Sequence, residues 1–335
     1  MNVRNTHSLR SSVRYESEVR QQATAGGGAG VVADICRPVR PGDMELPWPS
    51  GNSGSYAPHA KAGLSLGACV SNSEQPAKRY VFDPLWDQET ERLLTNEAIW
   101  DPGTSERLDR LGVAAGWSVL EVGAGYGGTA ERLAELVGPT GRVTAADLET
   151  GRLARLKDKG IEVLQVDITT DELPAGQFDL VHSRMLVQHL PDRPAAVRKM
   201  VAALKPGGWL FLEDTDSLPL FRSVVSEDFL QDVRAAGYGL MRESGHEPRG
   251  GHFDLQAVLE CGLEDVSAEG RTVMMQGGSP QARHYQLWLE FMRPRITGAG
   301  LLDDARIDAA LEEMADPANR WLSQILISTY GRRPR

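Results

Sequence analysis

Short apolar runs alternate with segments of helical spacing from Trp117 onward, and this alternation limits the folds open to the chain. Strands that alternate with helices in this way form a parallel sheet that is covered on both faces. We therefore expect an α/β fold whose ligands bind at the carboxyl ends of the strands. The apolar runs predict strands at 117–122, 142–147, 161–167, 178–183 and 209–213.

The intervening segments have apolar side chains at helical spacing. Pro102 is expected to begin a new helix, because proline is favoured in the first turn. The helices predicted in this part of the chain cover 87–99, 102–111, 129–137, 153–160 and 194–204.

A glycine-rich turn follows the first strand. Gly123, Gly125 and Gly127 allow the backbone to turn sharply and to approach a ligand closely. This signal is weak alone, because Gly123, Gly125 and Gly128 also fit the dinucleotide pattern G-x-G-x-x-G. Glu121 in the preceding strand would repel a pyrophosphate, whereas S-adenosyl-L-methionine (SAM) brings a cationic amino group and a sulfonium. The turn therefore favours SAM.

Two aspartates end the next two strands. Asp147 is placed to accept hydrogen bonds from both hydroxyls of a ribose. Asp167 is placed to accept from the exocyclic amine of adenine, with Ile168 packing on the ring. Their order along the chain extends the nucleoside site begun by the glycine turn.

These motifs, taken in order, resemble those of class I SAM-dependent methyltransferases. The resemblance covers about residues 80–335 and rests on 119–127, Asp147, Asp167, Phe178-Asp179 and 204–208. It implies a Rossmann-like fold with a seven-stranded, mostly parallel sheet and an antiparallel last strand. Strands six and seven would then be 264–275 and 324–330.

Several shorter stretches look closer to actinobacterial small-molecule methyltransferases of natural-product metabolism. They are 80–83, 180–184, 189–192, 277–278 and 323–334. The methyl acceptor would then be a small, aromatic or apolar metabolite. An indole- or peptide-derived natural product is one example of such an acceptor. Methylation at oxygen, nitrogen or carbon stays open.

The resemblance implies SAM as the cofactor and a binding set at the strand ends. Arg184 is expected to contact the methionine carboxylate or Glu121, and Asp179 is expected to be structural. The cofactor-binding residues are predicted to be Glu121, Gly123, Ala124, Gly125, Gly127, Asp147, Leu148, Asp167, Ile168, Ser183 and Arg184.

His189 is the candidate catalytic residue, because the family resemblance puts it beyond strand four, near the transferred methyl group. If the acceptor is a hydroxyl, His189 would act as a base and lose activity by protonation below about pH 6.5. Glu213 and Asp214 are the alternative bases, followed by His246 and His252. A carbon or amine nucleophile needs no such base.

Segments added to the core are expected to form the acceptor site. They cover 80–115, 214–253 and 279–320, and they supply Trp86, Trp100, Phe221, Phe229, Tyr238, Phe253, Tyr285, Trp288 and Phe291. Within them, 279–297 and 303–315 are predicted helices. The alternative for the face that carries Tyr285 and Trp288 is that it only packs against the sheet.

Two other functions remain open. An NAD-dependent oxidoreductase could use the same fold, although Glu121 and the Lys-Pro-Gly-Gly turn at 205–208 disfavour it. A SAM-binding protein without methyl transfer, such as a cyclase, is disfavoured by the complete motif set.

The chain divides at about residue 80. Residues 1–79 are polar, rich in Gly and Ser and without periodicity, which predicts a disordered extension. Residues 80–335 form the expected methyltransferase domain, with 116–213 as the SAM-binding core and 214–253 and 279–320 as a helical substrate cap.

Composition narrows the partners. The net charge of -10 gives no electrostatic basis for binding nucleic acid or anionic lipid. No apolar run is long enough to cross a membrane. Three widely spaced cysteines provide neither a disulfide framework nor a metal site, which fits a cytoplasmic protein. The oligomeric state stays open between a monomer and a homodimer.

Overall fold

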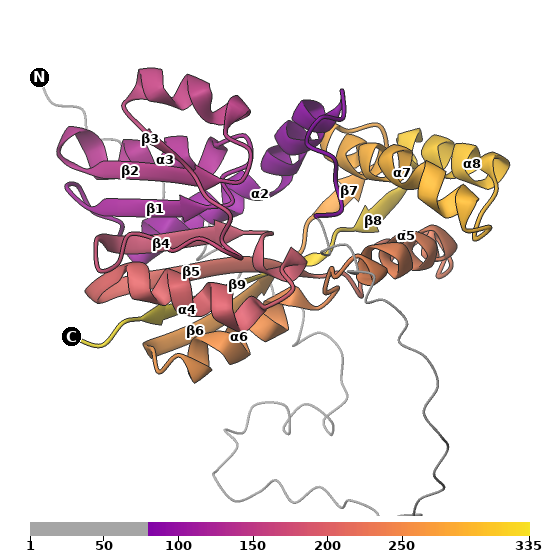
Figure 1. The fold of residues 1–335 in the computed structure, drawn as a ribbon. Coiled ribbons are helices and arrows are strands. Elements are labelled where there is room, and N and C mark those ends of the chain that lie inside the picture. The colour runs from indigo at the N-terminus through magenta and orange to yellow at the C-terminus, as the bar shows by residue number, and fades with distance from the viewer. Residues whose placement is uncertain (1–79) are drawn as a thin grey trace, which may run out of the picture. The chain divides into compact units, whose positions relative to one another are not determined.

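A seven-stranded sheet lies at the centre of the computed structural model, which describes residues 80–335 (Figure 1). The strand order is β3-β2-β1-β4-β5-β9-β6. Pairs from β3 to β5 are parallel, and β9 is antiparallel to both neighbours, which confirms the expected sheet. The strands are β1 (Ser118–Val122), β2 (Arg142–Asp147), β3 (Glu162–Gln165), β4 (Phe178–Arg184), β5 (Leu204–Asp216), β6 (Glu264–Arg271) and β9 (Ile325–Arg332). The expected extension at 1–79 lies outside the described residues.

Helices connect and cover these strands. The α-helices are α2 (Glu89–Leu111), α3 (Gly128–Val137), α4 (Arg193–Ala203), α5 (Gln231–Glu243), α6 (Gly250–Glu260), α7 (Pro280–Gly298) and α8 (Asp304–Ala315). Three 3₁₀ helices are η1 (Gly138–Thr140), η2 (Gly151–Lys159) and η3 (Val187–His189). Among these described helices, none has the length and apolar character that a membrane span requires.

The sheet is buried on both faces, as alternating side chains show. Val119 and Leu180 point into a core with α3, whereas their neighbours Leu120 and Val181 point into a core with α4 and α6. This period of two is the geometry of a pleated strand. It explains why the strand segments are continuous apolar runs in the sequence.

Helix α2 is continuous through Pro102, so the predicted break there is wrong. Proline removes one helical hydrogen bond and costs ~3 kcal/mol in a helix interior. Ile99 and Trp100 before it and Leu108 after it are all buried. One uninterrupted helix buries side chains on both sides of the proline, and this packing offsets the lost bond.

Three other boundaries differ from the expected ones. The predicted α-helix at 153–160 is the 3₁₀ helix η2. Strand β5 includes the expected turn at 205–208, because Leu204 already pairs with Phe178 of β4. The single strand expected at 264–275 is divided, since β7 (Met274–Gln276) pairs with β8 (Arg320–Leu322) in a separate two-stranded sheet.

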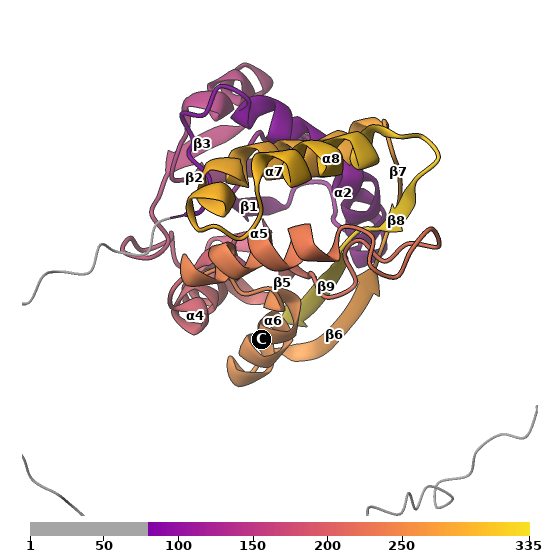
Figure 2. The ribbon, with the colours of Figure 1, turned by 90° about the vertical axis from the view of Figure 1, so that its right-hand side faces the viewer.

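A second hydrophobic core lies beyond the sheet, among α5, α7, α8 and the β7–β8 sheet, which we call the cap. Figure 2 shows α7 and α8 running past α5. The core of the cap includes Phe221, Tyr285, Trp288, Met292 and Trp321, all buried. The helix face that carries Tyr285 and Trp288 therefore packs within the cap and not on the sheet.

A buried acidic pair lies between β5 and α6. Asp214 and Asp254 are almost completely buried, and both carboxylate oxygens of Asp254 have no hydrogen-bond partner. Burial raises the pKa of Asp254 well above its ordinary value, and the neighbouring Asp214 raises it further. The folded protein therefore retains a proton here that the unfolded chain loses, so the free energy of unfolding falls as the pH rises through and above the ordinary carboxyl range.

We expect Asp254→Asn to stabilise the protein at about pH 8, because it removes one of two mutually repelling buried groups. A gain of ~1–3 kcal/mol corresponds to a rise in Tm of roughly 3–10 °C. The gain should shrink at about pH 5, where the native pair is protonated at less cost. Thermal unfolding at both pH values tests this, with the exposed Asp158→Asn on η2 as control. An equal gain at both pH values would contradict it.

Candidate functional site

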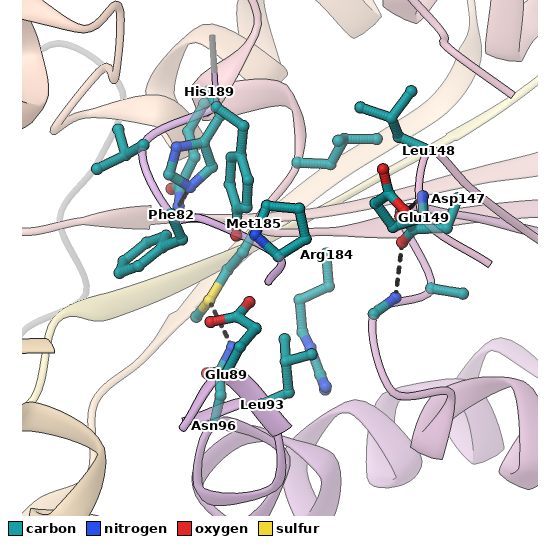
Figure 3. Close-up of a pocket in the computed structure, with 18 of the residues that line it drawn as sticks. Phe82, Glu89, Leu93, Asn96, Asp147, Leu148, Glu149, Arg184, Met185 and His189 are labelled. Carbon is teal, nitrogen blue, oxygen red and sulfur yellow. Dashed lines mark hydrogen bonds between the residues drawn. The ribbon is translucent and has the colours of Figure 1, made fainter. Parts of the chain in front are cut away.

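A cavity of about 1200 Å³ opens at the carboxyl ends of β1, β2 and β4 (Figure 3). One half is lined by the glycine turn, Asp147 and Asp167, and the other half by η3, α5 and α7. Figure 3 shows Asp147 and His189 on opposite sides of the space, with Met185 between them. The cavity therefore joins a polar half to an aromatic half.

The backbone of the glycine turn is held against β2. The N–H groups of Gly123 and Ala124 donate to the carbonyl of Ala146 at 2.8 and 3.1 Å. Gly123 and Gly125 have φ values of 77° and 61°, in the left-handed region. Gly127 precedes α3 with φ 96° and does not line the cavity, and a Cβ there would lie 2.7 Å from Leu156. Its role in this structure is steric.

The two aspartates are fixed by backbone donors. Asp147 accepts from Gly125 N at 2.9 Å and from Glu149 N at 3.0 Å. Burial raises the pKa of Asp147, and the backbone hydrogen bonds act against that rise. Asp167 accepts from Thr169 through both its N–H and its hydroxyl. Both aspartates line the cavity, as do Leu148 and Ile168.

Glu121 lines the cavity from within β1 and lies 3.7 Å from Nδ1 of His182. His182 is completely buried in β4. Burial lowers its pKa, but the carboxylates of Glu121 and Glu213 on either side outweigh burial and raise it. His182 thus lies between two carboxylates that favour its protonated form.

The alternative bases on β5 do not reach the cavity. Glu213 is completely buried and accepts hydrogen bonds from Thr104 at 2.5 Å and Ser328 at 2.6 Å. Asp214 accepts from Gln188 N at 2.6 Å and faces α6. Neither residue lines the cavity, because β5 directs these side chains into the protein. His252 pairs with Asp216 at 2.9 Å and is also outside the lining.

Arg184 lines the cavity but is already bound by α2. Its guanidinium donates to Asp101 at 2.6 Å and to Thr104 at 2.9 Å. The expected partner Glu121 receives no hydrogen bond from it in this structure. Ser183 is buried, does not line the cavity, and its hydroxyl has no partner. Asp179 accepts from Ser118 N at 2.8 Å, which confirms its structural role.

Glu97 of α2 is a site residue that the sequence does not indicate. Its carboxylate accepts from Gly128 N at 2.8 Å, at the start of α3, and it lines the cavity. Burial raises the pKa of Glu97 to about 7. Glu97 reaches Gly128 only because α2 packs against α3. No local sequence pattern around residue 97 predicts that contact.

His189 stands on the aromatic side of the cavity. Its ring lies 5.1 Å from that of Tyr80 and 4.7 Å from that of His246. Burial, His246, Arg92 and Arg193 hold its pKa well below the ordinary value. The expectation that this imidazole protonates near pH 6.5 is therefore wrong.

The aromatic half is hydrogen-bonded through Gln324. Tyr285 donates to Gln324 Oε1 at 2.6 Å, and Gln324 donates to the hydroxyl of Tyr238 at 2.8 Å. Trp288 completes this wall. Four of the other expected aromatics do not line the cavity: Trp100, Phe221 and Phe229 are buried, and Trp86 packs on Phe291. Phe253 and Phe291 also lie outside the lining, and Phe253 is exposed.

Comparison with known proteins adds to this geometry. Residues 119–208 match the family model described as a methyltransferase domain. Phosphoethanolamine N-methyltransferase 1 of Triticum aestivum is 31% identical over 175 residues, which are 50% of this chain and 32% of that protein. The ubiquinone/menaquinone biosynthesis C-methyltransferase UbiE of Pseudomonas putida is 37% identical over 113 residues, 31% of this chain and 44% of that protein. The chain thus spans about a third to a half of these relatives' lengths.

Among solved structures, one match is phosphoethanolamine N-methyltransferase 2 of Haemonchus contortus, in complex with phosphomonomethylethanolamine and S-adenosylhomocysteine. It is 19% identical, has a TM-score of 0.46, and the match covers 74% of this chain and 58% of that chain.

His246 generates a testable pH dependence of stability. It is 3% exposed, neither ring nitrogen has a hydrogen-bond partner, and burial lowers its pKa to about 4, with Arg193 and Arg242 adding to the effect. Between about pH 6.5 and pH 4, the imidazole of His246 is therefore protonated in the unfolded chain but stays neutral in the folded protein. Stability from this group is complete above that pH and is lost as the pH falls towards 4.

We expect His246→Phe to flatten the acid limb of the stability curve. The difference between about pH 7 and pH 4 should shrink by up to ~3 kcal/mol, because the ring no longer titrates. Urea unfolding at several pH values measures this. The half-exposed His252→Phe is the matched control. If His246→Phe and the wild type keep parallel curves, His246 is not the titrating group.

Proposed function

We propose that the chain transfers the methyl group of SAM to a small, neutral aromatic or apolar acceptor, starting from the match of residues 119–208 to the methyltransferase-domain family model. The observation that carries the proposal is one continuous cavity that joins a nucleoside-sized polar half to an aromatic half. A methyl donor in the first half and an acceptor in the second would meet beside Met185 and His189. Holding two reactants in this way can supply ~7–11 kcal/mol of a barrier.

The polar half suits SAM better than a dinucleotide. A dinucleotide places its pyrophosphate on the N-terminus of the first helix, where free N–H groups attract anions. Here the carboxylate of Glu97 already accepts from Gly128 N, and Asp101 lies beside it. Two acidic side chains at this point oppose a pyrophosphate, which argues against an NAD-dependent oxidoreductase.

We assign the cofactor roles to the residues predicted from the sequence that line this half. Asp147 would bind the ribose, Asp167 and Ile168 the adenine, and Glu121 the amino group of SAM, with the backbone at 123–125 against the methionine part and Leu148 against the nucleoside. Gly127 and Ser183 would act indirectly, by shaping the turn and the end of β4. Arg184 would act through Asp101 and Thr104.

The aromatic half favours a neutral acceptor. His189, His246 and His284 have pKa values held below the ordinary range by burial, so all three are uncharged near neutrality. The arginines that line the described cavity are each engaged by the protein: Arg92 by Glu89, Arg152 by Thr90 and Pro84, and Arg184 by Asp101. Among these three arginines only Arg152 has no acidic partner, and it belongs to η2 and not to η3, α5 or α7, which line the aromatic half. The aromatic half of the described lining therefore offers no unpaired cation for the phosphate group of a phosphorylated acceptor.

The segments at 214–253 and 279–320 would then act as the substrate cap of the SAM-binding core at 116–213, and the N-terminal helices at 80–115 would add to the acceptor site. A natural-product acceptor of the kind methylated in actinobacterial metabolism fits the aromatic wall of Tyr238, Tyr285 and Trp288. A SAM-binding protein without methyl transfer would share the polar half, and product detection separates the two.

Asp147→Ala should weaken SAM binding by tenfold or more, because a carboxylate that binds two hydroxyls forms charge-assisted bonds of ~1.5–3 kcal/mol each. Isothermal titration calorimetry with SAM and with NADH measures this on the full chain. Asp158→Ala, on the exposed side of η2, is the matched control. Unchanged SAM affinity in Asp147→Ala would remove this residue from the ribose site, and tight NADH binding by the wild type would overturn the choice of cofactor.

Tritiated SAM tests the transfer itself. Incubation with a panel of neutral aromatic metabolites should move the labelled methyl group into an extractable product. Glu121→Gln should abolish most of that transfer, because the amino group of SAM loses its carboxylate. Binding of SAM without any labelled product would favour the binding-protein alternative, and transfer only to phosphorylated acceptors would overturn the neutral-acceptor assignment.

A further inference from the structure

The carboxylate of Glu97 lies beside the glycine turn with one oxygen fixed and the other available. Oε1 accepts from Gly128 N at 2.8 Å, at the first residue of α3. Oε2 forms no hydrogen bond within residues 80–335 and is not enclosed, since Glu97 is only partly buried and lines the cavity. The backbone of α3 therefore orients this carboxylate and leaves one of its oxygens for a ligand.

Acidic groups outnumber basic ones around Glu97. Burial raises its pKa, and the carboxylates of Asp101 on α2 and Glu121 on β1 raise it further. The N–H of Gly128 and the guanidinium of Arg184 on β4 act against that rise. A Cβ atom on Gly128 would lie 2.8 Å from Cδ of Glu97 and 2.6 Å from Oδ2 of Asp101, so both carboxylates border the same point. Because Arg184 is already paired with Asp101 at 2.6 Å, this edge of the cavity has an excess of negative charge.

The carboxylate of Glu121 independently indicates a cationic ligand at the same edge. Glu121 is 3% exposed and lines the cavity, and its Oε2 has no hydrogen-bond partner. Nδ1 of His182 lies 3.7 Å from its Oε1, beyond hydrogen-bond distance. A buried carboxylate oxygen without a donor is costly, and a ligand that supplies the donor removes that cost. A cationic group that reaches Glu97 and Glu121 would supply both carboxylates with a hydrogen-bond donor.

We propose that Glu97, together with Glu121, binds the ammonium group in the methionine part of SAM, and that Glu97 releases a proton to the solvent when the cofactor binds. An ammonium group carries a positive charge and donates hydrogen bonds, so it favours the ionised form of a carboxylate. Burial raises the pKa of Glu97 to about 7, so a fraction of this group is protonated near neutrality and must ionise on binding. This inference rests on the proposed function, which assigns the ammonium group to Glu121 alone.

The direction of the pH dependence follows from these two protonation states. Well below pH 7, Glu97 is mostly protonated, and the release of that proton opposes binding of the ammonium group. Well above pH 7, Glu97 is already ionised, and the affinity no longer changes with pH. Complete release of the proton corresponds to an affinity that rises about tenfold between about pH 6 and pH 8.

Two nucleosides separate the ammonium group from the rest of the cofactor. S-adenosylhomocysteine carries the amino acid group, whereas 5′-methylthioadenosine has the same nucleoside and sulfur without it. Isothermal titration calorimetry on the full chain should show the affinity for S-adenosylhomocysteine, relative to that for 5′-methylthioadenosine, rising about tenfold from about pH 6 to pH 8. Asp147 would bind the ribose that both probes share, so any titration of Asp147 cancels in this ratio. A ratio that does not change with pH would overturn the proposal.

Glu97→Gln is the diagnostic variant, because an amide of nearly the same shape cannot ionise. It should weaken binding of S-adenosylhomocysteine by about tenfold or more at about pH 8 and much less at about pH 6, which makes the ratio to 5′-methylthioadenosine independent of pH. Glu106→Gln removes an exposed carboxylate from the same helix and should keep the wild-type ratios at both pH values. A pH-dependent ratio that persists in Glu97→Gln would assign the proton to another group and overturn the role of Glu97.

A count of released protons tests the wild type alone, whether or not the variant folds. Calorimetry at about pH 7 in two buffers of different ionisation enthalpy gives the number of protons released per ligand bound. S-adenosylhomocysteine should release about half a proton more than 5′-methylthioadenosine, because Glu97 is about half protonated at that pH. Equal release by the two probes would overturn the role of Glu97 and leave the proposed cofactor site intact. Binding of neither probe at any pH would instead overturn the cofactor site itself, and this inference with it.

Discussion

The buried carboxylate of Glu213 is the interaction on which the arrangement of the site depends. It accepts hydrogen bonds from Thr104 of α2 and Ser328 of β9, and it lies 3.4 Å from His182 of β4. A buried charge is costly unless its lone pairs are satisfied, and removing one partner typically costs ~3–5 kcal/mol. These bonds therefore hold helix α2 in one position relative to the sheet. Because α2 forms one wall of the cavity, the same bonds determine where that wall lies.

Helix α2 carries this constraint to the cofactor half of the cavity. Thr104, which binds Glu213, also accepts from Arg184, and Arg184 binds Asp101 one turn earlier on the same helix. Glu97, a further turn back, then reaches Gly128 at the start of α3. An acidic helix face is thereby placed where a dinucleotide would need positive charge. The selectivity of the proposed site depends on a helix that contributes nothing to the glycine turn itself.

The opposite half of the cavity depends on neutral hydrogen bonding in place of charge. Gln324 joins Tyr238 and Tyr285, and Gln188 joins Thr215 and His189. The amide of Gln188 has a fixed orientation, because its partner, the backbone N–H of Thr215, can only donate. Such fully connected networks leave few free polar atoms, and the unpartnered nitrogens of His189 and His246 stand out against them. The neutral acceptor that we propose would face a wall whose polar groups are mostly paired with one another.

The parallel sheet, the glycine turn, and the aspartates at the end of β2 and just after β3 followed from the sequence alone, because period-two burial and strand-terminal residues are local patterns. The continuous α2, the burial of Glu213 and Asp214 away from the cavity, and the contact of Glu97 with Gly128 did not. These features depend on contacts between segments far apart in the chain. The chemistry of His189 divides in the same way: the sequence placed it beyond strand four, but the lowering of its pKa depends on burial and on His246, Arg92 and Arg193, which only the folded structure brings beside it.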